Sequence, residues 1–206
     1  MAAPIETLPD NARGAKRRLE SRKRLLAAAR KLFVERGYHA TRPQDIARVA
    51  GLGHGTFYLH FADKQECFLA FVDDLREEVD EAIMSRASEA KDLSGFIEAV
   101  LTAIYDYSEA HPGLLSTAMT DEAVISAGGK PGKTLLHRWG EEWAEMLKTQ
   151  AKSSMIAKDY DLPILGQAIV GAIHQASSST YGSGRGRANL LKTLTQFIVR
   201  ALAPRS

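Results

Sequence analysis

The sequence has little of what secreted and membrane proteins need. Its 206 residues include a single cysteine, Cys67, so no disulfide can form within the chain. We expect Cys67 to be a small buried residue in a reducing compartment. No run of about 18 apolar residues is present, and residues 1–20 lack the apolar core of a secretory signal. The sequence therefore predicts a cytoplasmic protein with no membrane span.

The spacings that carry enzyme chemistry are also missing. His54 and His60 do not have the spacing of a zinc-protease motif, and no Glu-x-x-His pair is present for a di-iron site. No G-x-S-x-G, P-loop or dinucleotide-binding glycine pattern occurs, and the glycine-rich residues 182–187 follow a predicted helix. The remaining histidines are scattered: His39, His111, His137 and His174. We expect no metal, no cofactor and no catalytic activity.

Alternating strand patterns of useful length are absent, and helical spacing is found almost throughout. Apolar residues recur at helix spacing from Leu25 to Phe33, and Gly37 is expected to end that first helix. A short second helix is predicted to follow Thr41 and to be broken by Gly51-Leu52-Gly53, and a third short helix is predicted to carry Phe57 and Phe61. A long linking helix is predicted from Asp63 to about Ile83. Further helices are predicted along residues 93–111, 114–119, 135–147, 163–180 and 190–201, with loops at 126–133 and 158–163. The fold class is all-α, with a small three-helix unit followed by a larger helical bundle.

Two helix starts have the spacing of a capping box. Thr41 and Gln44 have it before the second helix, where Pro43 stands in the first turn. Asp63 and Glu66 repeat the spacing at the start of the linking helix.

Charge of the two signs is unevenly distributed. Residues 1–64 hold 13 Lys/Arg against 6 Asp/Glu, whereas residues 65–206 hold 14 against 19. A basic N-terminal third on an acidic remainder indicates that only the first part binds a polyanion.

Two short helices around a glycine turn, preceded by a longer helix, are typical of a helix-turn-helix unit. Phe57 and Phe61 lie four residues apart and should both face inward, and Gly51 permits the chain reversal through a left-handed φ. The outer face is then left with small or hydrogen-bonding residues, which suit a DNA major groove: His54, Gly55, Thr56, Tyr58 and His60.

Residues 37–68, GYHATRPQDIARVAGLGHGTFYLHFADKQECF, resemble the N-terminal signature of the tetracycline-repressor-like (TetR) family of bacterial transcriptional regulators. The matching elements are Gly37-Tyr38, Asp45-Ile46-Ala47, Ala50-Gly51, Gly55-Thr56-Phe57-Tyr58, His60-Phe61 and Asp63-Lys64. The resemblance covers roughly residues 20–75, and beyond them only helix order and length fit. It implies phosphate contacts for Tyr58, His60 and Lys64, base contacts for His54, Gly55 and Thr56, and backbone and groove contacts for Thr41, Arg42 and Gln44.

This sequence departs from the family pattern at two positions. The family usually has serine at Gly53, the N-cap of the recognition helix, and the change removes a hydroxyl there. The position of Arg42 is usually serine or threonine, so Thr41 is expected to cap the second helix instead.

The expected organisation has three parts. Residues 1–18 would be a flexible basic arm, residues 19–64 the helix-turn-helix DNA-binding domain, and residues 65–206 the linking helix with an effector-binding and dimerisation domain. The resemblance implies a small-molecule cavity in this last part, for an apolar or aromatic effector. Large or polar-tipped residues could line it: Tyr105, Tyr107, Met119, Trp139, Trp143 and His174.

The function expected from these features is a ligand-responsive repressor. It would bind a palindromic double-stranded DNA operator as a homodimer through its C-terminal helices, where the small residues Gly171, Ala172, Ala176 and Ser178 allow close packing. Two alternatives stay open: a DNA-binding architectural protein with little sequence preference, and an all-α enzyme with an incidental basic N-terminus.

Overall fold

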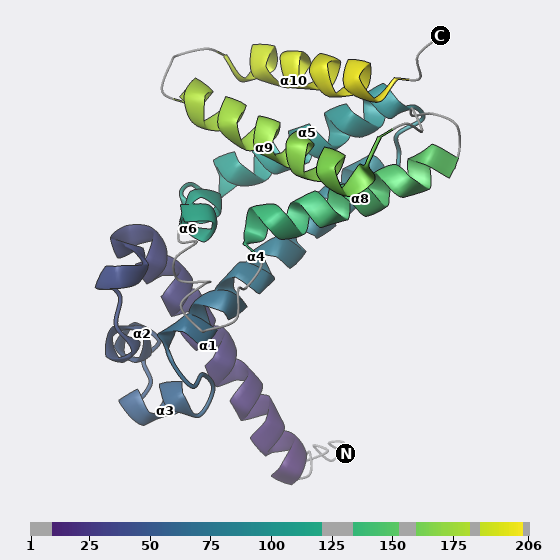
Figure 1. The fold of residues 1–206 in the computed structure, drawn as a ribbon. Helices are drawn as coiled ribbons and strands as arrows, with labels where there is room; N and C mark the ends of the chain where they lie inside the picture. Colours follow the sequence, from purple (N-terminus) through teal and green to yellow (C-terminus); the bar gives the residue numbers. More distant parts are fainter. Residues whose placement is uncertain (1–9, 121–133, 153–159, 182–185, 204–206) are drawn as a thin grey trace, which may run out of the picture. The chain divides into compact units, whose positions relative to one another are not determined.

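The structure is a computed structural model, and it describes residues 10–120, 134–152, 160–181 and 186–203. Within these ranges every regular element is an α-helix, which confirms the predicted fold class (Figure 1). The predicted loop at 126–133 and part of that at 158–163 lie outside the described residues. No helix in the ranges given above has both the length and the apolar character that a bilayer span requires.

The chain divides into two compact units, Met1–Asp73 and Asp74–Ser206. The boundary falls inside α4 (Lys64–Ala87), whereas the sequence predicted it before that helix, at residue 64. The linking helix therefore contributes residues to both units.

The N-terminal unit contains α1 (Asp10–Ala40), α2 (Pro43–Val49), α3 (His54–Tyr58) and the first residues of α4. Aromatic packing joins the long helices: the Phe33 ring centroid lies 5.2 Å from that of Phe68 and 5.9 Å from that of Phe71. Ile46 of α2 and Phe57 of α3 are both fully buried. The buried residues of α1 include the predicted stripe from Leu25 to Phe33.

Helix α1 begins earlier than predicted. Residues 10–18 are helical, not the flexible arm expected there, and residues 1–9 lie outside the described residues. The run Ala15-Lys16-Arg17-Arg18 consists of strong helix formers, and Gly14 opposes it alone. Gly37 interrupts the helix with φ 77° and ψ 167°, so the predicted break is confirmed, although a short helical stretch continues to Ala40.

The predicted capping box at the start of α2 is wrong. The N-cap residue is Arg42, with no side-chain cap bond, although Pro43 does occupy the first turn. The Thr41 side chain is fully buried, and its hydroxyl donates to the carbonyls of Leu32 at 3.2 Å and Gly37 at 2.8 Å. The break at Gly37 leaves carbonyls near the end of α1 without helical hydrogen-bond donors. The Thr41 hydroxyl donates to these carbonyls instead of capping α2.

The capping motif of α4 forms as predicted. Asp63 Oδ1 accepts from the Glu66 N–H at 2.8 Å, and the Glu66 carboxylate accepts from the Ala62 N–H at 2.5 Å. Cys67, one turn into the helix, is fully buried as expected.

The C-terminal unit is built from the rest of α4, α5 (Leu93–Ala110), α6 (Leu114–Thr120), α8 (Leu135–Lys152), α9 (Leu162–Tyr181) and α10 (Arg187–Leu202). These helices confirm the ones predicted from residue 93 onward. Asp92 and Asp161 begin α5 and α9 by accepting hydrogen bonds from the Gly95 and Ile164 N–H groups. The core of this unit is apolar and includes Ile97, Leu101, Leu147, Ile198 and Leu202.

Helices α8 and α9 pack against each other. A Cβ atom added to Gly166 of α9 would lie 2.1 Å from the Gly140 carbonyl oxygen of α8 and 2.9 Å from the Ala144 nitrogen. Glycine at position 166 lets the two backbones approach this closely, whereas a Cβ atom on Gly140 would meet the Gln167 side chain at 2.3 Å.

Candidate nucleic-acid interface and ligand cavity

Helix α3 is held in place by two aromatic anchors. Phe57 is 0% and Phe61 2% exposed, and their ring centroids are 5.5 Å apart. The turn before α3 has the left-handed φ of 64° at Gly51 that the sequence predicted. Gly53 is the N-cap, and the helix start has no side-chain capping bond. The cap that a serine hydroxyl would provide at this position is therefore missing.

Arg24 of α1 secures the turn, and the sequence did not single it out for this. Its Nη2 donates to the Ala50 carbonyl at 2.5 Å and to the Gly51 carbonyl at 3.2 Å. These are the carbonyls at the C-terminal end of α2, where a cation is favoured. The partners are 26 and 27 residues away in the chain, so no local pattern could have indicated the contact.

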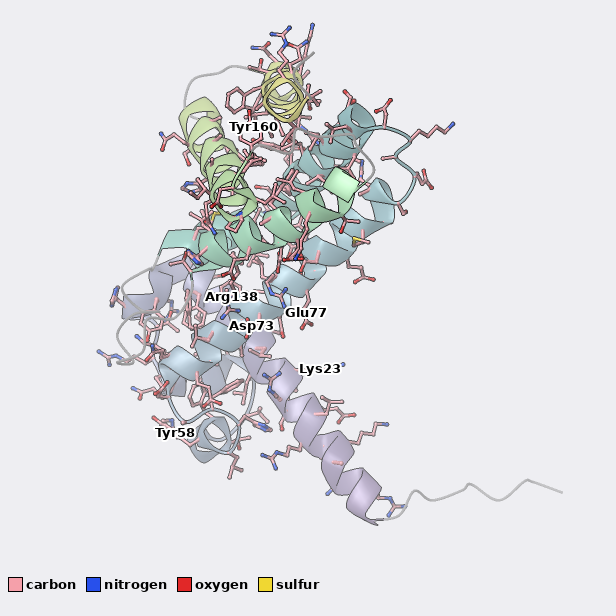
Figure 2. The ribbon with its side chains drawn as sticks, turned by 45° about the vertical axis from the view of Figure 1, so that its right-hand side comes forward. Lys23, Tyr58, Asp73, Glu77, Arg138 and Tyr160 are labelled. Carbon is pink, nitrogen blue, oxygen red and sulfur yellow. The ribbon has the colours of Figure 1, made fainter. Side chains whose placement is uncertain are left out.

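The exposed arc of α3 comprises His54, Gly55, Tyr58 and Leu59. The rings of His54 and Tyr58 meet edge-on, 5.2 Å apart, and Tyr58 is 51% exposed (Figure 2). A Cβ at Gly55 would meet nothing within 4 Å, so the fold itself does not require glycine there. Leu59 is 70% exposed, and the sequence analysis did not identify it.

Thr56 and His60 lie on another side of α3, beside α1. With Arg17, Arg18, Ser21 and Leu59 they line a hollow of about 490 Å³. The Ser21 hydroxyl and His60 Nε2 are 2.6 Å apart. Burial lowers the pKa of His60, and the nearby guanidinium groups of Arg18 and Arg22 lower it further. The hollow is therefore electropositive and rich in hydrogen-bonding groups.

The remaining predicted DNA contacts differ in how far their side chains are available to DNA. Arg42 and Gln44 are exposed at the start of α2, where the prediction needs them. Lys64 donates to the carbonyls of Tyr38 at 2.8 Å and His39 at 3.4 Å, and it lies 4.1 Å from the centroid of the Tyr38 ring. Thr41 is wrong as a DNA contact because its side chain is fully buried.

Basic residues continue along α1 next to this surface. Residues 13–24 hold seven Lys/Arg and one acid, Glu20, and residues 13–20 are all exposed. Figure 2 labels one of the seven, Lys23 on α1. The whole N-terminal surface combines a cationic helix with a short polar helix that carries one exposed leucine.

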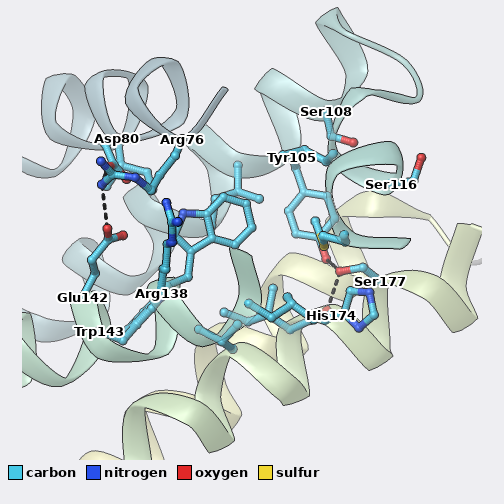
Figure 3. A pocket seen from close by; sticks show the side chains of 18 of the residues that line it. Arg76, Asp80, Tyr105, Ser108, Ser116, Arg138, Glu142, Trp143, His174 and Ser177 are labelled. Carbon is cyan, nitrogen blue, oxygen red and sulfur yellow. Dashed lines mark hydrogen bonds and ion pairs between the residues drawn. The ribbon is translucent and has the colours of Figure 1, made fainter. Parts of the chain in front are cut away.

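A cavity of about 1340 Å³ lies in the C-terminal unit (Figure 3). It is lined by five of the six residues predicted for an effector site: Tyr105, Met119, Trp139, Trp143 and His174. Tyr107 is wrong for this site. It is not part of the lining, its hydroxyl donates to the Glu78 carboxylate, and its ring packs 4.5 Å from that of His111.

The cavity is apolar along most of its wall and has two polar ends, which Figure 3 separates. At one end Arg76 Nη1 lies 3.1 Å from Asp80 and 2.8 Å from Glu142. Burial, with the neighbouring Glu142 carboxylate, raises the pKa of Asp80 to about 6, against the pull of Arg76. At the other end the hydroxyl of Tyr105 contacts that of Ser177.

One further polar group in the wall has no protein partner. Trp139 Nε1 is buried and makes no hydrogen bond to any described residue. A buried donor left unpaired is costly, and a ligand acceptor would satisfy it. In the same described ranges, no three side chains of His, Cys, Asp or Glu are placed to bind one metal ion.

The fold and these sites define a helix-turn-helix protein with a separate helical domain, and known proteins share the arrangement. A family model described as "Bacterial regulatory proteins, tetR family" matches residues 25–71. The transcriptional activator FasR of Mycolicibacterium smegmatis is 33% identical over 112 residues, which cover 52% of this chain and 51% of FasR. The transcriptional regulator TtgR of Pseudomonas putida is 40% identical over 73 residues, covering 35% of this chain and 34% of TtgR.

Solved structures extend the similarity to the C-terminal unit as a fold. The fatty acid degradation regulator FadR from Bacillus halodurans aligns with a TM-score of 0.73 at 18% identity, covering 87% of this chain and 94% of that one. RolR in complex with resorcinol aligns with a TM-score of 0.67 at 20% identity, covering 93% and 91%. The chain matches the tetR family model over its helix-turn-helix region, residues 25–71, and resembles these solved structures in fold. It spans about half, or less, of the length of the curated relatives FasR and TtgR.

Proposed function

We propose that the chain is a ligand-responsive transcriptional regulator that binds a palindromic operator as a homodimer. The observation that carries the proposal is the exposed arc of α3, which is anchored from behind by Phe57 and Phe61 and lies beside a cationic α1. A small, partly polar helix in this setting suits a major groove, while the cations suit phosphates. Repression, the direction expected from the sequence, is the mode we propose.

The proposed DNA contacts follow the exposure of each residue. His54 and Gly55 would approach base edges, and Tyr58, Arg42 and Gln44 would meet the backbone. Thr56 and His60 would contribute through the hollow beside α1, and Gly53 through its backbone at the start of α3. Lys64 donates to the carbonyls of Tyr38 and His39. We therefore propose two roles for Lys64: it would hold the end of α1 in place, and it would attract a nearby phosphate.

Dimerisation is proposed through α9 and α10. One recognition helix reads too few base pairs, whereas two about 34–36 Å apart read successive major grooves. An exposed stripe on α9 supports this role, because it combines one large apolar residue and one glutamine with small residues: Ile164, Ala168, Gly171, Gln175 and Ser178. Ile164 is 68% exposed, and Phe197 of α10 is 55% exposed.

The cavity of the C-terminal unit is the proposed effector site. Its apolar wall and two tryptophans favour an apolar or aromatic molecule, and the structural neighbour RolR is described with the aromatic ligand resorcinol. Helix α4 supplies Phe68 and Phe71 to the N-terminal core and Asp80 and Ile83 to the cavity wall. An effector that favours one position of α4 would thereby change DNA affinity.

A selection of bound duplexes from a random pool tests the proposal. We expect the wild-type protein to enrich a palindrome, since two equivalent helices would read two half-sites. His54→Ala should relax the preference within each half-site, while the matched control His137→Ala, at an exposed histidine of α8, should keep it. A pool with no enriched sequence, despite tight and salt-sensitive binding, would identify an architectural DNA-binding protein instead.

We assign no catalytic activity to the chain. The relatives FasR and TtgR are named as transcriptional regulators. The proposed site of action is the bacterial cytoplasm, where the chromosomal DNA is.

A further inference from the structure

We propose that Leu59 recognises the 5-methyl group of a thymine in each operator half-site. Leu59 would thus set the sequence preference at one base pair of the half-site that the polar residues beside it do not read. The inference rests on the proposed DNA-binding function and adds to it a named residue and the chemical group that this residue reads.

The exposure of Leu59 is the first observation. At 70%, Leu59 is the most exposed of the large hydrophobic residues in the described ranges. Phe57 and Phe61 already fill the inner side of this segment, so Leu59 is not needed to hold α3. A single exposed leucine is common on protein surfaces, so the position of Leu59 beside the cations of α1 is what indicates its partner.

The backbone fixes the direction of this side chain. Leu59 is the C-cap of α3 with φ −74° and ψ −17°, and the His60 and Phe61 N–H groups both bond to the Phe57 carbonyl. The turn therefore continues with helical geometry, and Leu59 shares the exposed face with Gly55, four residues earlier. Because Gly55 has no side chain and open space around its Cα, a flat base edge can reach Leu59 across it.

The charge around Leu59 indicates that its partner is a nucleic acid. Leu59 also borders the hollow lined by Arg17, Arg18 and Ser21. Seven cations and one acid lie on residues 13–24. An apolar protein surface would have to cover these arginines, whereas a duplex presents phosphates to them and bases beside the phosphates. The thymine methyl is the apolar group of the major-groove edge, so it is the group that Leu59 can recognise there.

Replacing thymine by deoxyuridine tests the proposal directly, because deoxyuridine removes only the methyl group and keeps the base pair. In the operator obtained by selection, each thymine is replaced in turn, and Kd is measured by fluorescence anisotropy for wild type and Leu59→Ala. We expect the wild type to lose about fourfold in affinity at one position per half-site, the fold-change that corresponds to one buried methyl group. Leu59→Ala should bind the thymine operator more weakly and lose nothing further on deoxyuridine.

Three controls make the result decisive. Leu59→Met should retain sensitivity to the methyl group because it keeps apolar reach. Leu19→Ala removes a leucine that is 55% exposed elsewhere on α1, and should respond to deoxyuridine as the wild type does. Circular dichroism should show unchanged unfolding for Leu59→Ala, since the residue has little burial to lose.

The outcomes separate this inference from the proposed function. If wild type and Leu59→Ala lose the same affinity on deoxyuridine, or neither loses any, thymine recognition by Leu59 is overturned while operator binding stands. If Leu59→Ala binds the operator as tightly as wild type, Leu59 does not touch DNA and its proposed role in recognition is overturned. If selection yields no operator at all, the proposed function fails first.

Discussion

Asp80 stands at one end of the C-terminal cavity in a strained electrostatic position. It shares the Arg76 guanidinium with Glu142, so two carboxylates face one cation. Burial and Glu142 raise the pKa of Asp80 from 3.8 to about 6. Because the folded pKa exceeds the unfolded one, the protonated carboxyl favours the folded state. The contribution of Asp80 to stability is therefore fully present below pH 3.8 and is lost as the pH rises through about 6.

We predict that Asp80→Asn, which mimics the neutral carboxyl, unfolds less readily than wild type at pH 8. The expected gain is about 1 kcal/mol, a value reduced for solvent screening because the side chain is 36% exposed. The gain should vanish near pH 4. Urea unfolding followed by tryptophan fluorescence measures it, since both tryptophans, Trp139 and Trp143, belong to the C-terminal unit.

Glu145→Gln is the matched control for Asp80→Asn. Its carboxylate is 74% exposed and pairs with Lys148 at 3.4 Å, so it should change the pH profile little. A profile for Asp80→Asn that runs parallel to that of wild type between pH 4 and pH 8 would contradict the prediction.

Single residues also mark where sequence reasoning succeeded and failed. Phe57, Phe61 and Gly51 were predicted correctly because neighbours in the chain determine their roles. Thr41 was assigned wrongly, since its partner at Leu32 lies nine residues back and prevails over the local capping motif. Leu59 was missed because nothing nearby in the sequence reveals that Phe57 and Phe61 already fill the inner side.

At the scale of elements, the crossing of α8 and α9 depends on Gly166. A Cβ atom there would meet backbone atoms of α8, whereas Gly171, further along α9, is exposed and a Cβ atom added to it would meet nothing within 4 Å. The same substitution at the two positions of α9 should therefore have opposite effects on the free energy of unfolding.

We predict that Gly166→Ala destabilises the C-terminal unit by about 1–3 kcal/mol, because its methyl group would lie against the Gly140 carbonyl and force the helices apart. Gly171→Ala should stabilise the monomer by about 0.5–1 kcal/mol through helix propensity, although the same methyl group would oppose close packing in the proposed dimer. Urea unfolding measures both substitutions at a protein concentration at which the chain is monomeric. Equal effects of the two substitutions would show that the α8–α9 crossing tolerates a wider spacing.

The helices themselves were predicted well from residue 93 onward, because their apolar residues recur with clear helical spacing. The start of α1 was not, since residues 13–20 are all exposed and have no apolar stripe to indicate a helix. Only helix propensity favours a helix in that segment, and the sequence was instead interpreted as a flexible basic arm. The cavity lining was predicted from large residues, and five of them line the cavity. Helix spacing could not show that Tyr105 faces the cavity while Tyr107 does not.

At the scale of the whole molecule, the proposed dimer makes a prediction about association. Phe197→Glu should weaken dimerisation at least tenfold, because a charge would be buried at the centre of an apolar contact. Sedimentation velocity over a range of concentrations measures the change. Leu19→Glu, at a residue with the same 55% exposure on α1, is the matched control and should leave association unchanged.

Two results would contradict the dimer assignment. The first is a wild-type protein that stays monomeric at all concentrations. The second is an unaltered dimer in both Phe197→Glu and Ile164→Glu, which would place the interface on other helices. Either result leaves the proposed reading surface of α3 untouched, because that surface belongs to the N-terminal unit.

Recognition and folding are carried by different residues of the same short segment, residues 54–61. Phe57 and Phe61 are buried, while His54, Gly55, Tyr58 and Leu59 form the exposed arc. Substitutions on the arc can therefore accumulate without loss of the fold, and gene duplicates of such a protein can diverge in operator choice by a few surface changes. The buried phenylalanines must be kept for the fold, whereas the exposed residues can change and so give the protein new target sites.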